Sequence, residues 1–208
     1  MKTRDFQNAS WWDEQVKTHG HALGSSDYSA RSHAHRLQAF AKVLYDLFGY
    51  GTFSLLDVPC GVGLLPAELQ CAPLRYTGVD FSPEALRECR EHVPDAELLQ
   101  VDLGAADWHR LIPAQAYDAI VCCGLFCFDG LFAGETAAAQ FTQELLEHAG
   151  TKQAVLLANF PWAGDNSYCE GIQRYRIDNT LIELQRAGLH GRARFDYLPH
   201  EFMCTVRQ

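Results

Sequence analysis

Residues 55–64, with the sequence LLDVPCGVGL, decide the fold, because an apolar run ends there in a glycine-containing turn and continues into a second apolar segment. Thr52–Val58 predicts a buried strand, and Leu64–Gln70 predicts a short helix. A strand that enters a helix through such a turn exposes backbone N–H groups beside the helix N-terminus. Because glycine has no Cβ atom, a ligand can lie directly against this backbone. We therefore expect a ligand site at residues 57–63, where Asp57 favours a cationic or amine-bearing ligand over a phosphate.

Beyond this turn, short apolar runs alternate with helical segments. Further strands are expected at Arg75–Asp80, Glu97–Val101, Tyr117–Cys123 and Gln153–Phe160. Helices are expected from the N-cap Ser82 to His92, from Trp108 to Leu111, over Thr136–His148 before Gly150, and over Tyr168–Ala187 before Gly188. This alternation predicts parallel β-α-β units with right-handed crossovers, and therefore a doubly wound α/β sheet.

The final segment, 191–208, has the sequence GRARFDYLPHEFMCTVRQ and predicts two strands joined by a tight turn at Leu198-Pro199-His200. A connection this short cannot hold a crossover helix, so these two strands must be antiparallel. With the earlier strands, they give a mostly parallel seven-stranded sheet that ends in a C-terminal antiparallel hairpin.

The N-terminal part predicts a helical cap on this core. Ser32–Phe48 has apolar residues at three- and four-residue steps and ends before Gly49, which is typical of a helix with one buried face. Residues 11–30 contain several Gly, Ser and aromatic residues, and Trp11 and Trp12 favour burial. We expect a single domain over 1–208, with the cap and helix at 1–50 and the α/β core at 51–208.

Composition favours a cytoplasmic protein with a small-molecule partner. The 208 residues carry 17 basic and 26 acidic side chains, for a net charge of -9, whereas nucleic-acid binding depends on neutralising phosphates. No segment approaches the roughly 20 apolar residues of a membrane span. The first residues lack the apolar core of a signal peptide. We therefore expect no nucleic-acid or membrane partner, while the oligomeric state stays open.

The eight cysteines predict free thiols rather than disulfides or a metal site. No C-x-x-C pair is present, and several of the cysteines lie in apolar runs. Two H-x-H pairs, His19/His21 and His33/His35, have no carboxylate cluster beside them. The second pair lies on an expected helix, where residues i and i+2 point apart. We expect no metal.

Two aspartates follow strands at the same edge of the expected sheet as the glycine turn. Asp80 lies about 20 residues after that turn, where an acidic residue can hydrogen-bond a ribose diol. Asp102 follows the third strand, where a carboxylate can accept a hydrogen bond from an adenine amino group. Ligands of open α/β sheets bind outside the carboxyl ends of the strands. The three aspartates together therefore favour a nucleoside-containing ligand.

From Thr52 to Gln208 the sequence resembles the class I S-adenosylmethionine-dependent methyltransferase family. Asp57-x-x-x-Gly61-x-Gly63 is similar to its first motif, which lies under the methionine part of the cofactor, and Cys122–Phe126 matches the segment that faces cofactor and acceptor. Pro59 departs from the glycine of many members, which removes one backbone donor. The cofactor-binding residues that the resemblance implies are Asp57, Pro59, Cys60, Gly61, Gly63, Asp80, Phe81, Asp102, Leu103 and Cys123.

The resemblance implies an enzyme of the EC 2.1.1 type that uses S-adenosyl-L-methionine and releases S-adenosyl-L-homocysteine. We expect O- or N-methylation of a small polar metabolite. A small acid is the first class to test, because arginine binds carboxylates through a planar two-pronged contact. The expected acceptor pocket comprises Trp11, Trp12, Tyr28, Phe126, Phe160, Trp162, Tyr168 and Arg174, with Arg176 as a second arginine. Candidates for a general base are His19, His21, Tyr28 and His200.

Other functions remain open at this point. A nicotinamide-dependent oxidoreductase would have a third glycine where Pro66 stands. A non-catalytic domain could bind the cofactor as a sensor or a subunit, and a protein or RNA methyltransferase is a further alternative. Asn159-Phe160-Pro161-Trp162 is similar to the Asn-Pro-Pro-aromatic motif of methyltransferases that modify exocyclic amines. It follows the fifth expected strand rather than the fourth and lacks the first proline, so we reject it.

Overall fold

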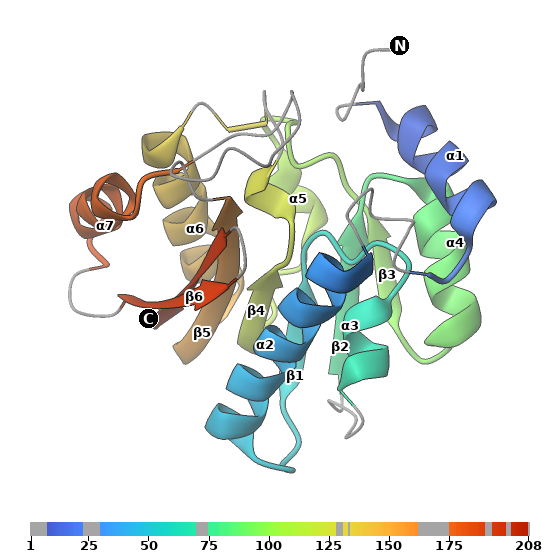
Figure 1. The fold of residues 1–208 in the computed structure, drawn as a ribbon, viewed down its shortest axis with the longest axis horizontal. Coiled ribbons are helices and arrows are strands. Elements are labelled where there is room, and N and C mark those ends of the chain that lie inside the picture. The colour runs from blue at the N-terminus through green and yellow to red at the C-terminus, as the bar shows by residue number, and fades with distance from the viewer. Residues whose placement is uncertain are drawn as a thin grey trace.

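A computed structural model describes residues 8–22, 30–69, 75–127, 131–132, 134–161, 175–189, 193–198 and 201–207. One seven-stranded sheet with the order β3-β2-β1-β4-β5-β7-β6 runs through the molecule (Figure 1). The strands are β1 (Ser54–Asp57), β2 (Arg75–Asp80), β3 (Glu97–Gln100), β4 (Tyr117–Cys122), β5 (Gly150–Pro161), β6 (Ala193–Leu198) and β7 (Glu201–Arg207). The helices are α1 (Ala9–His19), α2 (Ala30–Phe48), α3 (Leu64–Glu68), α4 (Pro83–His92), α5 (Trp108–Leu111), α6 (Glu135–Ala149) and α7 (Ile177–Arg186), with the 3₁₀ turn η2 (Leu125–Cys127).

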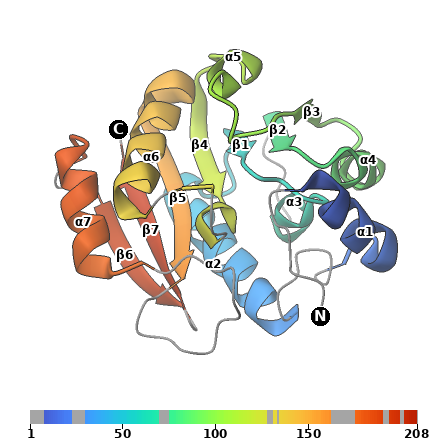
Figure 2. The same ribbon diagram turned by 90° about the horizontal axis from the view of Figure 1, so that it is seen from above.

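Helices cover both faces of the sheet (Figure 2). Along β1 and β4, neighbouring side chains pack on opposite faces. Leu55 of β1 packs in one core cluster with α2, α3 and α4, whereas its neighbour Leu56 packs in the other with α5, α6 and α7. Val121 and Ile120 of β4 divide between the clusters in the same way. Strands buried on both faces are typical of a parallel sheet. The doubly wound α/β prediction is therefore confirmed.

Strand pairing brings the ends of the parallel strands to one edge. β1 pairs in parallel with β2 and β4, with Asp57 opposite Gly78 and Val121. β2 pairs in parallel with β3, and β4 with β5. β7 is antiparallel to β5 and β6, which confirms the C-terminal hairpin. The loops that follow β1, β2, β3 and β4 therefore meet at the carboxyl edge of the sheet, where ligands of such sheets bind.

Most element boundaries lie within a few residues of those expected, and the helix expected at Tyr168–Ala187 is the main exception. The described helix α7 begins at Ile177, and Arg176 before it has extended φ and ψ of -97° and 131°. Tyr175 donates its backbone N–H to the carbonyl of Pro161 at 2.8 Å, so it cannot belong to the helix. Residues 168–174 lie outside the described residues.

Within the described ranges, no helix is both long and apolar enough to cross a membrane. Six cysteines are free thiols there, and all but Cys123 are buried. Cys71 and Cys169 lie outside these ranges, so eight free thiols remain a prediction. In the same part of the chain, no three His, Cys, Asp or Glu side chains are grouped to hold a metal, and metal independence also remains a prediction.

Candidate functional site

The turn between β1 and α3 contains two glycines with different roles. Gly61 and Gly63 have φ of 53° and 81°, in the left-handed region that favours glycine. A Cβ atom on Gly63 would lie 2.8 Å from Sγ of Cys89, so Gly63 is needed for the turn to pack on α4. A Cβ atom on Gly61 would meet nothing within 4 Å. The outer side of Gly61 therefore faces space that a ligand can fill against the backbone.

Asp80 fastens this turn to the end of β2. One carboxylate oxygen accepts the backbone N–H of Gly61 and the other that of Ser82, each at 2.9 Å. Burial raises the pKa of Asp80 to about 6, although both N–H groups favour its charged form. Each carboxylate oxygen has two lone pairs, so roughly two further hydrogen bonds can be accepted. Two adjacent hydroxyl groups, as in a ribose diol, match that capacity.

Asp57, at the end of β1, has one carboxylate oxygen without a partner. Oδ2 accepts a hydrogen bond from the hydroxyl of Tyr76 at 2.8 Å. Oδ1 is buried and has no hydrogen-bond partner. Burial, together with the charge of Asp80, raises the pKa of Asp57 to about 7, although the hydrogen bond from Tyr76 acts in the opposite direction. A buried acceptor without a donor is unfavourable, so this oxygen fits a ligand that brings a donor or a positive charge to the turn.

The remaining predicted cofactor residues lie around the same edge. Asp102 is exposed and accepts the backbone N–H of Gly104 at 2.8 Å, which shapes the loop after β3. Cys123 follows β4, and burial raises the pKa of its thiol far above the usual range. Phe81, Leu103 and Pro59 are half-buried, Cys60 is buried, and the Val58–Pro59 peptide bond is cis.

The predicted acceptor residues lie in several places. Phe126 and Phe160 are buried in the core, with their rings stacked at 4.8 Å. Trp11 and Trp12 lie half-buried on α1 with their rings edge to face at 4.7 Å. Arg176 is exposed and pairs with Asp178. Tyr28, Trp162, Tyr168 and Arg174 lie outside the described residues.

Two of the predicted base candidates lie at the end of α1. His19 is exposed, whereas His21 is half-buried and its ring stacks on that of His92 at 3.8 Å. Burial lowers the pKa of His21, and the neighbouring His92 lowers it further. The stacking places His21 beside α4. His200, the other histidine candidate, lies outside the described residues.

A buried polar network, which the sequence did not reveal, joins α2 to β5 and β7. Arg36, 1% exposed, donates to Glu201 through Nη2 at 2.6 Å and through Nε to both carboxylate oxygens at 3.1 Å. Asn159 donates to the same carboxylate and accepts the backbone N–H of Gly124 at 2.7 Å. The network therefore connects α2 to the loop after β4. Its only sequence signal is polar residues within otherwise apolar segments.

His33 belongs to this network as a neutral imidazole. Its Nδ1 lies 3.2 Å from Nη1 of Arg36. A guanidinium can only donate, so Nδ1 accepts and the ring proton is on Nε2. Burial, with the charge of Arg36, lowers the pKa of His33 to about 3. His35 is exposed, as expected for residues that point apart on a helix.

Comparisons with known proteins agree with this geometry. Residues 55–152 match the family described as a methyltransferase domain. Over these residues the chain matches a methyltransferase domain, as the resemblance to class I methyltransferases predicts. S-adenosylmethionine is the cofactor of this class, so the family and cofactor predictions are confirmed. A comparison with curated protein sequences finds no match.

Several solved structures share the fold at low sequence identity. Magnesium protoporphyrin IX methyltransferase of Synechocystis PCC 6803 with bound SAH is 15% identical, with a TM-score of 0.69 over 99% of this chain and 97% of that chain. A SAM-dependent methyltransferase of Leishmania major is 13% identical, with a TM-score of 0.71 over 99% and 87%. The sugar N-methyltransferase KedS8 of Streptoalloteichus sp ATCC 53650 is 16% identical, with a TM-score of 0.61 over 85% and 87%.

Breaking the Arg36–Glu201 pair is expected to destabilise the fold. Removing one partner of a buried ion pair leaves an uncompensated charge and costs about 3–5 kcal/mol. Glu201→Ala should therefore lower the free energy of unfolding, measured in urea, by about this amount. Lys42→Ala, which breaks the exposed Lys42–Asp46 pair, should change it by less than about 1 kcal/mol. Equal effects of the two substitutions would contradict the network.

Asp57 makes the stability of the free protein depend on pH. Its folded pKa is raised from 3.8 to about 7, so the folded state holds the proton more tightly than the unfolded state. Stability is therefore lost as the pH rises from about 4 to about 7. Asp57→Asn should remove this part of the slope and stabilise the protein at pH 8 by at least ~1 kcal/mol. Urea unfolding between pH 5 and 8 measures both effects, and exposed Asp95→Asn is the control. An unchanged slope in Asp57→Asn would refute the assignment.

Proposed function

We propose that this protein binds S-adenosylmethionine at the ends of β1 to β4 and transfers its methyl group to a small polar metabolite. The observation that carries the proposal is the Asp80 carboxylate, held by the N–H groups of Gly61 and Ser82 beside the unpartnered oxygen of Asp57. Asp80 and Phe81 would contact the ribose, and Asp102 and Leu103 the adenine. The turn 57–63 would lie under the methionine part, with Asp57 accepting from its amino group. Residues 1–208 would act as one domain.

The chain's own residues prepare this site before any ligand arrives. Gly61 and Ser82 fix the Asp80 carboxylate, so its remaining lone pairs are already oriented when a diol arrives. When bound, S-adenosylmethionine supplies a methyl group on a positively charged sulfur. Its methyl carbon would be taken up by a lone pair of the acceptor, and the electrons of the carbon–sulfur bond would stay on sulfur. Holding the acceptor in line with that bond can lower the barrier by ~7–11 kcal/mol.

The small-molecule class is supported by the chemistry of the described residues and by relatives. The chain is acidic overall, with a net charge of -9, which disfavours a nucleic-acid acceptor. Two structural neighbours are named for a porphyrin and a sugar as acceptors. A small acid is the class we would test first, because Arg174 is predicted to line the acceptor pocket; Arg176, the second predicted arginine, pairs with Asp178.

Binding of S-adenosylhomocysteine tests the cofactor assignment. We expect calorimetry to give a dissociation constant in the micromolar range or tighter, which corresponds to about −8 kcal/mol. Asp80→Ala should weaken binding by roughly 1–3 kcal/mol, because the ribose loses hydrogen bonds to a charged group. Exposed Asp95→Ala is the matched control and should bind as the wild type does. Wild-type affinity in a folded Asp80→Ala variant, or tight binding of NAD instead, would refute the assignment.

An acceptor screen tests the reaction. The protein is incubated with a metabolite library and methyl-labelled donor, and label transfer is followed by mass spectrometry. We expect label on a small polar molecule, with small acids tested first. Label found only on RNA or folded protein would contradict the small-molecule acceptor. Tight cofactor binding with no labelled acceptor would favour a non-catalytic binding domain.

A further inference from the structure

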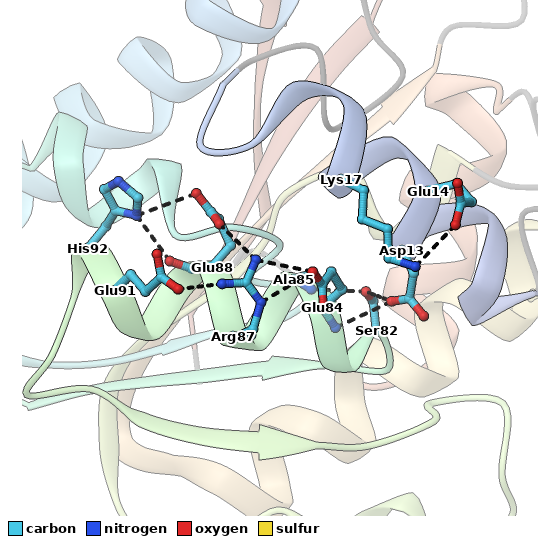
Figure 3. A network of polar contacts seen from close by, with 10 residues as sticks. All are labelled: Asp13, Glu14, Lys17, Ser82, Glu84, Ala85, Arg87, Glu88, Glu91 and His92. Carbon is cyan, nitrogen blue, oxygen red and sulfur yellow. Dashed lines mark hydrogen bonds and ion pairs between the residues drawn. The ribbon is translucent and has the colours of Figure 1, made fainter.

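Helix α1 is fastened to α4 through the carboxylate of Asp13 (Figure 3). Oδ1 of Asp13 accepts a hydrogen bond from the hydroxyl of Ser82 at 2.6 Å and from the backbone N–H of Glu84 at 3.3 Å. Ser82 is the N-cap of α4. A helix N-terminus has unpaired N–H groups and a partial positive charge, both of which favour a carboxylate. Asp13 thus fixes where α1 lies on the core.

Ser82 links this contact directly to Asp80. Its backbone N–H donates to Asp80 at 2.9 Å, while its hydroxyl donates to Asp13 and accepts the N–H of Ala85 at 3.0 Å. The side chain of Ser82 is completely buried, whereas Asp13 is half-buried. A displacement of Asp13 therefore acts on the residue that holds the Asp80 carboxylate.

A second contact joins α1 to the glycine turn itself. Val16 of α1 is buried in a small apolar cluster with Val62, which stands between the two glycines, and with Ala85 of α4. Both views show α1 beside α4 and away from α6 and α7 (Figures 1 and 2). α1 therefore contacts both segments whose backbone N–H groups hold Asp80.

We propose that Asp13 is a positioning residue that couples the docking of α1 to cofactor binding through Ser82 and Asp80. The inference rests on the proposed function. Ser82 donates its hydroxyl to Asp13 and its backbone N–H to Asp80, so the two carboxylates lie near each other on either side of this buried serine. Ribose hydroxyls that donate to Asp80 compensate its charge and reduce this repulsion, which strengthens the docked position of α1. By linkage, the docked helix strengthens cofactor binding by the same factor.

The test compares S-adenosylhomocysteine binding and hydrogen exchange in three single variants and one double variant. Asp13→Ala should weaken binding roughly tenfold, within the usual range of coupling between sites. In the wild type, the ligand should slow amide exchange over residues 9–19. In Asp13→Ala, the same segment should exchange rapidly with or without ligand. Glu14→Ala is the matched control, because Glu14 is exposed and pairs with Lys17 on the same helix.

The third variant separates coupling from a loss of stability. Ser82→Ala keeps the backbone N–H to Asp80 but removes the hydroxyl, so the double variant with Asp13→Ala should bind no more weakly than Ser82→Ala alone. Independent, multiplying losses would contradict the coupling. So would wild-type affinity in Asp13→Ala, even if this variant unfolds more easily. Failure of the wild type to bind would instead overturn the proposed function.

Discussion

The hydrogen bonds from Gly61 and Ser82 to the Asp80 carboxylate are the constraint on which the site depends. They join the turn after β1 to the turn after β2, whose strands are already paired in parallel. The bonds also keep the carboxylate buried with part of its accepting capacity unused. An acid in this position is costly to the free protein, as its pKa of about 6 indicates. Raised pKa values of buried acids are typical of functional sites, where a ligand supplies the missing hydrogen bonds.

A second set of buried charges lies at the other half of the carboxyl edge. Arg36 and Glu201 form a buried ion pair. Asn159 donates a hydrogen bond to Glu201 and accepts one from the backbone N–H of Gly124, in the loop after β4. At this end polar groups are paired, whereas Asp57 has an oxygen without a partner. The contrast indicates that the half with Asp57 and Asp80 can accept a ligand, while the network fixes the backbone of the loop after β4.

Features set by neighbouring residues could be predicted from the sequence, and features set by distant contacts could not. α4 starts at Pro83 as expected, because its cap bond from Ala85 to Ser82 spans three residues. The start of α7 differed, because the backbone N–H of Tyr175 bonds to the carbonyl of Pro161, which lies far from it in the sequence. Arg36 and Glu201 are 165 residues apart in the sequence, so a local sequence pattern cannot predict that they form an ion pair.

An NMR titration of the Asp80 carboxyl carbon with and without S-adenosylhomocysteine tests most directly whether Asp80 receives the ligand's hydroxyl groups. In the free protein the pKa should be about 6, because the group is buried. Hydrogen bonds from a ribose diol favour the charged form, so the pKa should fall when the ligand is bound and a proton should be released near pH 6. A pKa of Asp80 that is unchanged by saturating ligand would contradict this role of Asp80.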